Sequence, residues 1–164
     1  MTARVVGLDL SMTGTGIAWC DGTTYTVAPK LSGDARLLEI RSEVARAVDG
    51  RRLDLVVIED LPTHAKAAGI TGMVHGVVRA YLREMLLPYA LVAPASVKKY
   101  ATGKGNAGKP EMAVAAFKRG GREFRDDNQC DAWWLRAMGL EHLGQPITKL
   151  PAAQVAALDG VKWQ

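Results

Sequence analysis

The sequence has few cysteines, and they lie far apart. Its 164 residues include two, Cys20 and Cys130, and no Cys-x-x-Cys pair. A disulfide framework is therefore not indicated, and we interpret both residues as buried thiols in a reducing compartment. The three histidines, His64, His75 and His142, show no metal-ligand spacing, so a structural zinc site is not expected either.

Long hydrophobic runs are also lacking. No stretch of 18 or more apolar residues is present, so no membrane partner is expected. The start, MTARVVGLDL, lacks the basic region and long apolar stretch of a signal peptide, which favours the cytoplasm. Hydrophobic content of 48% with 23% charged residues is typical of a soluble globular protein, and the length fits one domain.

Positive charge is concentrated in one segment, although the net charge of +4 is mild. Residues 98–125 contain eight lysines and arginines against two glutamates. Such a local excess fits a surface that faces a polyanion such as DNA. A solvated basic surface explains the charge equally well before any motif is considered.

The hydrophobic pattern predicts an α/β fold with a mixed five-stranded sheet and helices on both faces. Strands are expected at residues 3–10, 16–20, 21–29, 53–60 and 89–94, the first three as an antiparallel meander. Helices are expected at residues 34–49, 72–87, 95–100, 110–119 and 127–143. The continuous apolar run LDLVVIED indicates a central strand. We expect one domain, residues 1–143, and a C-terminal tail, residues 144–164, with one short helix.

Two carboxylates lie at the ends of predicted strands. Asp9 ends the first strand and Glu59 ends the fourth. Side chains alternate between the two faces of a strand, so Asp9 and Glu59 each face the same side as the residues two and four positions earlier. If the two strands are parallel neighbours, both carboxylates meet at the edge of the sheet where ligands gather. Two such groups repel each other, so one is protonated or a cation lies between them.

A third acidic group comes from the stretch RDDNQCDAWW. Asp127 and Asp131 lie four residues apart on a predicted helix, so they share one face, and Asp131 is placed on its inner side. Asn128 could point there too, and Asp126 or Asp127 could instead cap the helix. Oxygen ligands of this kind suit Mg²⁺ or Mn²⁺. Asp9 has an alternative role as a capping residue of the turn that follows it.

Four stretches of the chain resemble the RuvC family of Holliday junction resolvases, within the RNase H-like nuclease superfamily. They are GLDLSMTGTGIA, DLVVIED, APASVKKYATGKGNAGKPEM and DNQCDA. The third is the specific one, because it is close to the family's Pro-x-x-Val-Lys-Lys and Thr-Gly-x-Gly-x-x-x-Lys run. The resemblance covers residues 3 to about 143. The length and the acidic run look most like the bacteriophage branch of the family.

The resemblance implies a structure-selective endonuclease that resolves four-way DNA junctions by paired symmetric nicks and leaves 5′-phosphates. Two Mg²⁺ or Mn²⁺ ions per site would be bound by Asp9, Glu59, Asp131 and Asp127, the last because Asn128 stands where the family often has His or Asp. Lys109 is the expected active-site lysine. The expected DNA-binding residues are Lys98, Lys99, Lys104, Lys109, His64 and Lys66. A homodimer through helix 72–87 is implied by the two-fold junction and the wide apolar face of that helix.

Three other functions remain open. The same fold could cut flaps, replication forks or RNA–DNA hybrids. GLDLSMTGTG also resembles the phosphate loop of actin-like and sugar-kinase folds, but that architecture needs two related halves. A DNA-binding domain without catalysis is the third possibility, and three intact carboxylates count against it.

Overall fold

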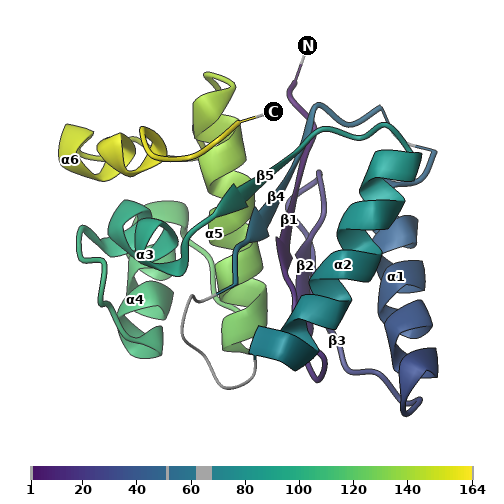
Figure 1. Cartoon of the computed structure of the whole chain (residues 1–164). Helices are drawn as coiled ribbons and strands as arrows, with labels where there is room; N and C mark the ends of the chain where they lie inside the picture. The colour runs from purple at the N-terminus through teal and green to yellow at the C-terminus, as the bar shows by residue number, and fades with distance from the viewer. Residues whose placement is uncertain (1, 51, 62–67, 164) are drawn as a thin grey trace.

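The computed structural model describes residues 2–50, 52–61 and 68–163. These residues form a mixed five-stranded sheet with helices on both faces, which confirms the expected fold class (Figure 1). The strands are β1 (Val5–Asp9), β2 (Thr15–Ala18), β3 (Thr24–Val27), β4 (Leu55–Glu59) and β5 (Tyr89–Val92), in the order β3-β2-β1-β4-β5. The first three are antiparallel neighbours, so the predicted meander is confirmed.

Strands β1 and β4 lie at the middle of the sheet. They pair in parallel, with Val5 opposite Leu55 and Leu8 opposite Ile58, and β5 adds to β4 in parallel. Every residue of both strands is buried except the last. An uninterrupted apolar run is what a strand covered on both faces requires. The predicted central position of the strand at residues 53–60 is therefore confirmed.

The helices divide between the two faces of the sheet, as Figure 1 shows. Helices α1 (Asp34–Val48) and α2 (Ala68–Glu84) cover one face; α3 (Pro94–Thr102), α4 (Lys109–Gly120) and α5 (Asp127–His142) lie on the other. In α1 the residues predicted to share a face, Leu37, Ile40, Val44 and Val48, are all buried. No helix in the described parts of the chain is both long enough and apolar enough to span a membrane.

Helix α2 begins at Ala68, four residues before the predicted start. The sequence prediction began this helix at position 72 and left Gly69 outside it. Glycine lowers helix stability by only about 1 kcal/mol per residue relative to alanine, which tertiary packing readily overrides. Val74, Val78 and Leu82 provide that packing, because all three are buried against the sheet.

Helix α5 lies unusually close to the sheet. A Cβ atom added at Gly7 would lie 2.0 Å from the carbonyl oxygen of Ala132, and one added at Gly16 would lie 2.0 Å from that of Asn128. In α5 itself, a Cβ atom added at Gly139 would lie 2.7 Å from the side chain of Val5 and 2.8 Å from that of Val57. No side chain fits at these positions, so the helix backbone rests directly on β1 and β2.

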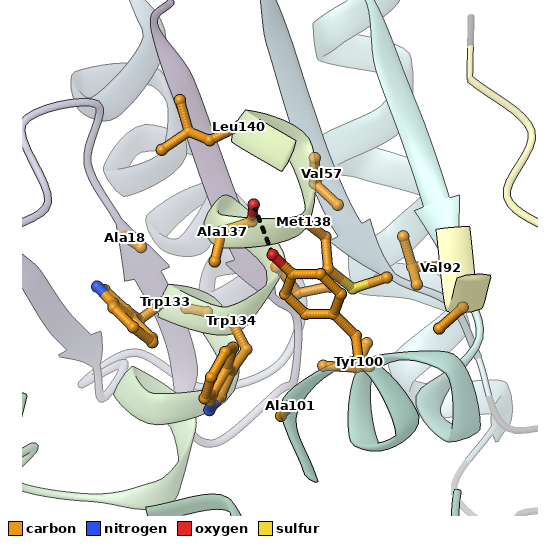
Figure 2. Close-up of a cluster of buried hydrophobic side chains, with 14 of the residues drawn as sticks. Ala18, Val57, Val92, Tyr100, Ala101, Trp133, Trp134, Ala137, Met138 and Leu140 are labelled. Atoms are coloured by element: carbon orange, nitrogen blue, oxygen red, sulfur yellow. Dashed lines mark hydrogen bonds between the residues drawn. The ribbon is translucent and has the colours of Figure 1, made fainter. Parts of the chain in front are cut away.

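Aromatic residues fill the core beneath α5. Figure 2 shows Trp133, Trp134 and Tyr100 packed among the aliphatic side chains of β4, β5 and α5. The Tyr100 hydroxyl donates a hydrogen bond to the carbonyl oxygen of Ala137 at 3.4 Å, and the Trp134 indole N–H donates to that of Met112 at 3.3 Å. Both tryptophans are buried in the core.

The segment after Leu143 packs against this core. It contains α6 (Ala152–Val155) and a short 3₁₀ helix, η1 (Ala156–Leu158). The Gln154 side chain donates a hydrogen bond to the carbonyl oxygen of Tyr100 at 2.6 Å, and Lys162 forms a bridge with Leu91 of β5. The end of the chain thus covers part of the β5 edge, which would otherwise expose unpaired backbone groups.

Candidate active site

Two carboxylates lie side by side at one edge of the sheet. Because β1 and β4 are parallel and Leu8 lies opposite Ile58, the next residues, Asp9 and Glu59, end their strands at the same level. Both are half-buried, whereas the residues before them are fully buried. The parallel pairing on which the sequence expectation depended is therefore present.

The loop after Asp9 is held by its own side chains. The Ser11 hydroxyl accepts a hydrogen bond from the Gly14 N–H at 2.9 Å. The Thr15 hydroxyl donates to the Ser11 carbonyl oxygen at 2.7 Å and accepts from the Ser11 N–H at 3.1 Å. These bonds close the turn in SMTGTG and fix the direction in which the chain leaves Asp9.

The third carboxylate, Asp131, comes from the first half of α5. It reaches the sheet edge because the backbone of α5 rests on Gly7 and Gly16. Asp131 lies near enough to raise the pKa of both Asp9 and Glu59 by repulsion. Three acidic groups from distant parts of the sequence therefore share one electrostatic environment.

Burial and mutual repulsion raise the pKa of all three groups. Burial raises the pKa of Asp9 to about 7, and the charges of Asp131 and Asp127 add to the effect. The pKa of Glu59 is raised to about 8, mainly by burial and further by repulsion from Asp9 and Asp131. The pKa of Asp131 rises to about 6 through burial and Asp127. A group of carboxylates in this state favours a bound proton or a bound cation.

Asp127 forms an ion pair with Lys109, the first residue of α4. The Lys109 ammonium lowers the pKa of Asp127, and the carboxylate in turn raises the pKa of Lys109. Lys109 also counteracts the raised pKa of Asp9 and of Asp131, so its charge acts on the whole cluster. The lysine that the sequence singled out thus lies at the acidic cluster.

The helix cap is Asp126. Its carboxylate accepts a hydrogen bond from the Gln129 N–H at 2.9 Å and one from the Thr26 hydroxyl at 2.8 Å. The expectation that Asp126 or Asp127 caps this helix is therefore confirmed for Asp126. Asn128 is half-buried against β2, and its side-chain nitrogen lies 3.0 Å from where a Cβ of Gly14 would be.

The other predicted DNA-binding lysines differ in position. Lys98 is half-buried and lowers the pKa of both Glu59 and Asp131, so it lies near the carboxylates. Lys99 is exposed on the same helix, and Lys104 pairs with Glu111 at 3.3 Å. His64 and Lys66 lie outside the described residues.

Carboxylate oxygens are the donors that Mg²⁺ and Mn²⁺ prefer, and a bound cation would relieve the burial and mutual repulsion that raise the pKa values of Asp9 and Glu59. The residue types therefore fit a divalent cation. Among the described residues, however, no group of three or more histidine, cysteine, aspartate or glutamate side chains is arranged so that it could hold a metal ion.

The sequence analysis did not recognise two features of the site. One is the close approach of α5, for which a glycine inside each of two strands, Gly7 and Gly16, was the available signal. The other is the proximity of Lys98 to the carboxylates. Sequence spacing carries no signal for that proximity, because Lys98 and Glu59 are on separate elements.

No protein-family model matches the chain. Solved structures of Thermus thermophilus RuvC do resemble it. One of RuvC itself superimposes with a TM-score of 0.65, and one of RuvC in complex with a Holliday junction substrate with a TM-score of 0.67. In both, the identity is 20%, with 87% of this chain and 97% of the other covered. The chain therefore has the RuvC fold, which belongs to the RNase H-like type.

Proposed function

We propose that this protein is a metal-dependent endonuclease that cuts branched DNA, with four-way junctions as its main substrate. The observation that carries this proposal is the convergence of Asp9, Glu59 and Asp131 at one sheet edge with raised pKa values. The likeness of the fold to RuvC supports it, since one RuvC structure contains a Holliday junction substrate. The products would be paired symmetric nicks with 5′-phosphate ends.

Asp9, Glu59 and Asp131 would hold two Mg²⁺ or Mn²⁺ ions, with Asp127 as the fourth ligand. When bound, the ions would activate a water molecule and stabilise the leaving 3′ oxygen. Each carboxyl group must first lose its proton, which the raised pKa values oppose at acidic pH. Because no three acidic side chains of the described residues are arranged to hold a metal ion, metal binding would require them to move closer together, and Asp127 would have to leave its ion pair with Lys109.

The basic residues would hold the DNA backbone. Lys109 and Lys98 lie nearest the carboxylates, so we assign them to the oxygens of the scissile phosphate. Lys99 and Lys104 lie further out and would contact neighbouring phosphates, together with His64 and Lys66. Such contacts fix the position of the duplex without reading its sequence.

We also propose a homodimer through α2. Its outer side exposes Ile70 and Met73, whose accessible fractions are 58% and 47%, and Met85 and Leu86, just beyond its C-terminal end, are exposed as well. A two-fold dimer would place one active site on each of two opposing strands of a four-way junction.

The dimer can be tested separately from catalysis. Met73→Arg places a charge in the proposed interface, and we expect sedimentation velocity to show a monomer where the wild type is a dimer. The variant would then give single nicks instead of paired ones. An unchanged sedimentation coefficient would exclude this interface. Leu38→Arg, on the exposed side of α1, is the matched control.

The substrate is tested with a labelled immobile junction, a flap, a fork and an RNA–DNA hybrid, each with Mg²⁺, Mn²⁺ or EDTA. Wild-type protein should nick the junction symmetrically, fastest among the four, and only with metal. Asp9→Asn should be inactive, whereas Asp159→Asn, the same change at an exposed C-terminal position, should not alter the rate.

Three outcomes would change the assignment. Faster cutting of the flap or fork would indicate a broader branched-DNA nuclease, and cutting of the hybrid alone would indicate an RNase H activity. Unchanged cutting by Asp9→Asn would remove the carboxylates from the mechanism. The remaining expectations, a bacteriophage origin and residence in the cytoplasm of a bacterial host, rest on the sequence alone.

A further inference from the structure

A pocket of about 620 Å³ lies between α4 and the beginning of α5, next to the carboxylates. Its walls come from α4, from the connection between α4 and α5, and from the first turns of α5. Pockets of this volume commonly bind small organic groups. The proposed hydrolysis needs only carboxylates, lysines and cations, so it leaves the pocket without a role.

The pocket wall on α4 is apolar and open to solvent. Phe117 and Val114 line it, and their accessible fractions are 56% and 50%. Met112, Ala115 and Ala116 of the same helix are buried and attach it to the core. The exposed aromatic ring of Phe117 is therefore not needed to hold α4 in place, and it is available to a ligand.

The opposite wall contains a second aromatic ring, which is fixed. Phe124 packs against Trp133 with ring centroids 5.8 Å apart, and the guanidinium of Arg122 lies 5.9 Å from the Phe124 centroid. Arg122 is itself anchored, because it donates a hydrogen bond to the carbonyl oxygen of Gly22 at 3.0 Å. The pocket thus combines a fixed aromatic wall, a free aromatic ring and a positive charge.

The pocket is continuous with the candidate active site. Asp131, Asp127 and Lys109 line one end of it, and these residues also belong to the acidic cluster. Phe117 follows Lys109 by eight residues on α4, which is about 12 Å along the helix axis. At about 3.4 Å per stacked nucleotide, that length spans some three nucleotides of a strand whose phosphate is held at Lys109.

We propose that this pocket binds an unstacked nucleobase of the cut strand, one to four nucleotides from the scissile phosphate. The proposal rests on the proposed function. A base has two flat faces that stack on aromatic rings, and the backbone phosphates of the strand that carries it match the charges of Lys109 and Arg122. Where the arms of a junction open at the branch point, the bases beside it lose a stacking neighbour and leave the helix at lower cost than bases within a duplex. Capture of the base would position the strand for cutting.

The first test removes bases from the DNA and the ring from the protein. Junctions that lack one base at a time, within four nucleotides of the nick, are cut by wild-type protein and by Phe117→Ala. We expect one abasic position to slow the wild type about 10-fold and to leave Phe117→Ala unaffected, because the variant has already lost the contact. Phe117→Tyr should restore the dependence on that base. Leu38→Ala, an equally exposed apolar residue on α1, is the control.

The second test measures base capture without cutting. Asp9→Asn is bound to junctions with 2-aminopurine at each of the same positions, and the fluorescence of the probe reports its stacking. We expect the fluorescence to change when the probe is at the position that the abasic series identifies. The double variant, Asp9→Asn with Phe117→Ala, should not show this change.

The outcomes separate this proposal from the proposed function. If every abasic junction slows both proteins equally and no probe responds, the nucleobase site is wrong, while junction cutting stands. If the wild type binds junctions without cutting them and a probe still responds through Phe117, the base site stands and the nuclease assignment fails. If Phe117→Ala alters the sedimentation coefficient but not the abasic dependence, the pocket is a protein interface.

Discussion

The two faces of the sheet differ in chemistry although the same two strands build both. Along β1, Leu8 and Asp9 point to opposite faces, and along β4, Ile58 and Glu59 do the same. Leu8 and Ile58 belong to the apolar cluster beneath α1 and α2. Asp9 and Glu59 face α5, with its carboxylate. The two-residue period of a strand thus separates the groups that stabilise the fold from the groups that we assign to catalysis.

The faces also differ in how the helices pack. Beneath α1 and α2, full-size aliphatic side chains fill the space between sheet and helix. Beneath α5, the backbone of the helix rests on Gly7 and Gly16. The packing beneath α1 and α2 therefore depends on the presence of side chains, whereas the contact of α5 with β1 and β2, next to the carboxylates, depends on their absence at Gly7 and Gly16. This difference can be tested by adding atoms to one face and removing them from the other.

The largest effect is expected from Gly7→Val. Its Cβ would lie 2.0 Å from the Ala132 carbonyl oxygen, so α5 must move away from the sheet. We expect a loss of about 3 kcal/mol in the free energy of unfolding, measured with urea, and loss of nicking. Ile58→Val on the opposite face, which removes one methylene group, should cost about 1 kcal/mol and leave nicking intact. Equal costs at the two sites would contradict the contrast between the faces.

The next effect concerns pH and the acidic face alone. The pKa values of Asp131, Asp9 and Glu59 are raised to about 6, 7 and 8, so these groups lose their protons progressively between about pH 6 and about pH 8. At limiting Mg²⁺ the initial nicking rate should rise at least about 10-fold from pH 6 to pH 8. Saturating Mg²⁺ should move the rise to lower pH, because the cation competes with protons. A rate that is independent of pH over this range would argue against the cluster as the metal site.

A smaller effect is expected in stability from Asp9→Asn. The pKa of Asp9 is about 7 in the folded protein, against 3.8 for a free side chain, so the folded state binds more protons between these values. Wild-type stability therefore falls as pH rises from about 4 to about 7 and stays low above it. At pH 8 in EDTA, Asp9→Asn should melt roughly 3 °C higher than the wild type, with no difference near pH 4. A lower melting temperature for the variant at pH 8 would contradict the raised pKa.

The smallest effect belongs to the apolar face, where His75 of α2 is only 2% exposed and its Nδ1 atom has no hydrogen-bond partner in the described structure. Burial lowers the pKa of His75. The negative charge of Asp60 raises this pKa, and the positive charge of Arg79 lowers it further. The unfolded chain therefore binds more protons below about pH 6.5, and stability is lost as pH falls. His75→Leu should gain about 1 kcal/mol at pH 5.5, by urea unfolding, and less at pH 7.5. An equal gain at both pH values would exclude the titration.

Much of the fold follows from local patterns. Hydrophobic periodicity predicted the meander, the buried central strand at residues 53–60 and the buried face of α1. It could do so because apolar residues recur every second position in a half-buried strand and every three to four positions in a helix. The start of α2 was misplaced because glycine was given too much weight against packing. Periodicity contains no information on how closely two elements approach, which is why the packing of α5 on Gly7 was not predicted.

What the sequence alone determined is the face on which each carboxylate lies, since Asp9 and Glu59 obey the strand period and Asp131 the helix period. Only the tertiary structure decided that the three groups share one environment, that Asp127 pairs with Lys109, and that a pocket opens beside them. The physical reason is the distance along the chain over which each property is determined. Side-chain direction is set by backbone geometry within a few residues, whereas the distance between elements is set by packing across the whole core.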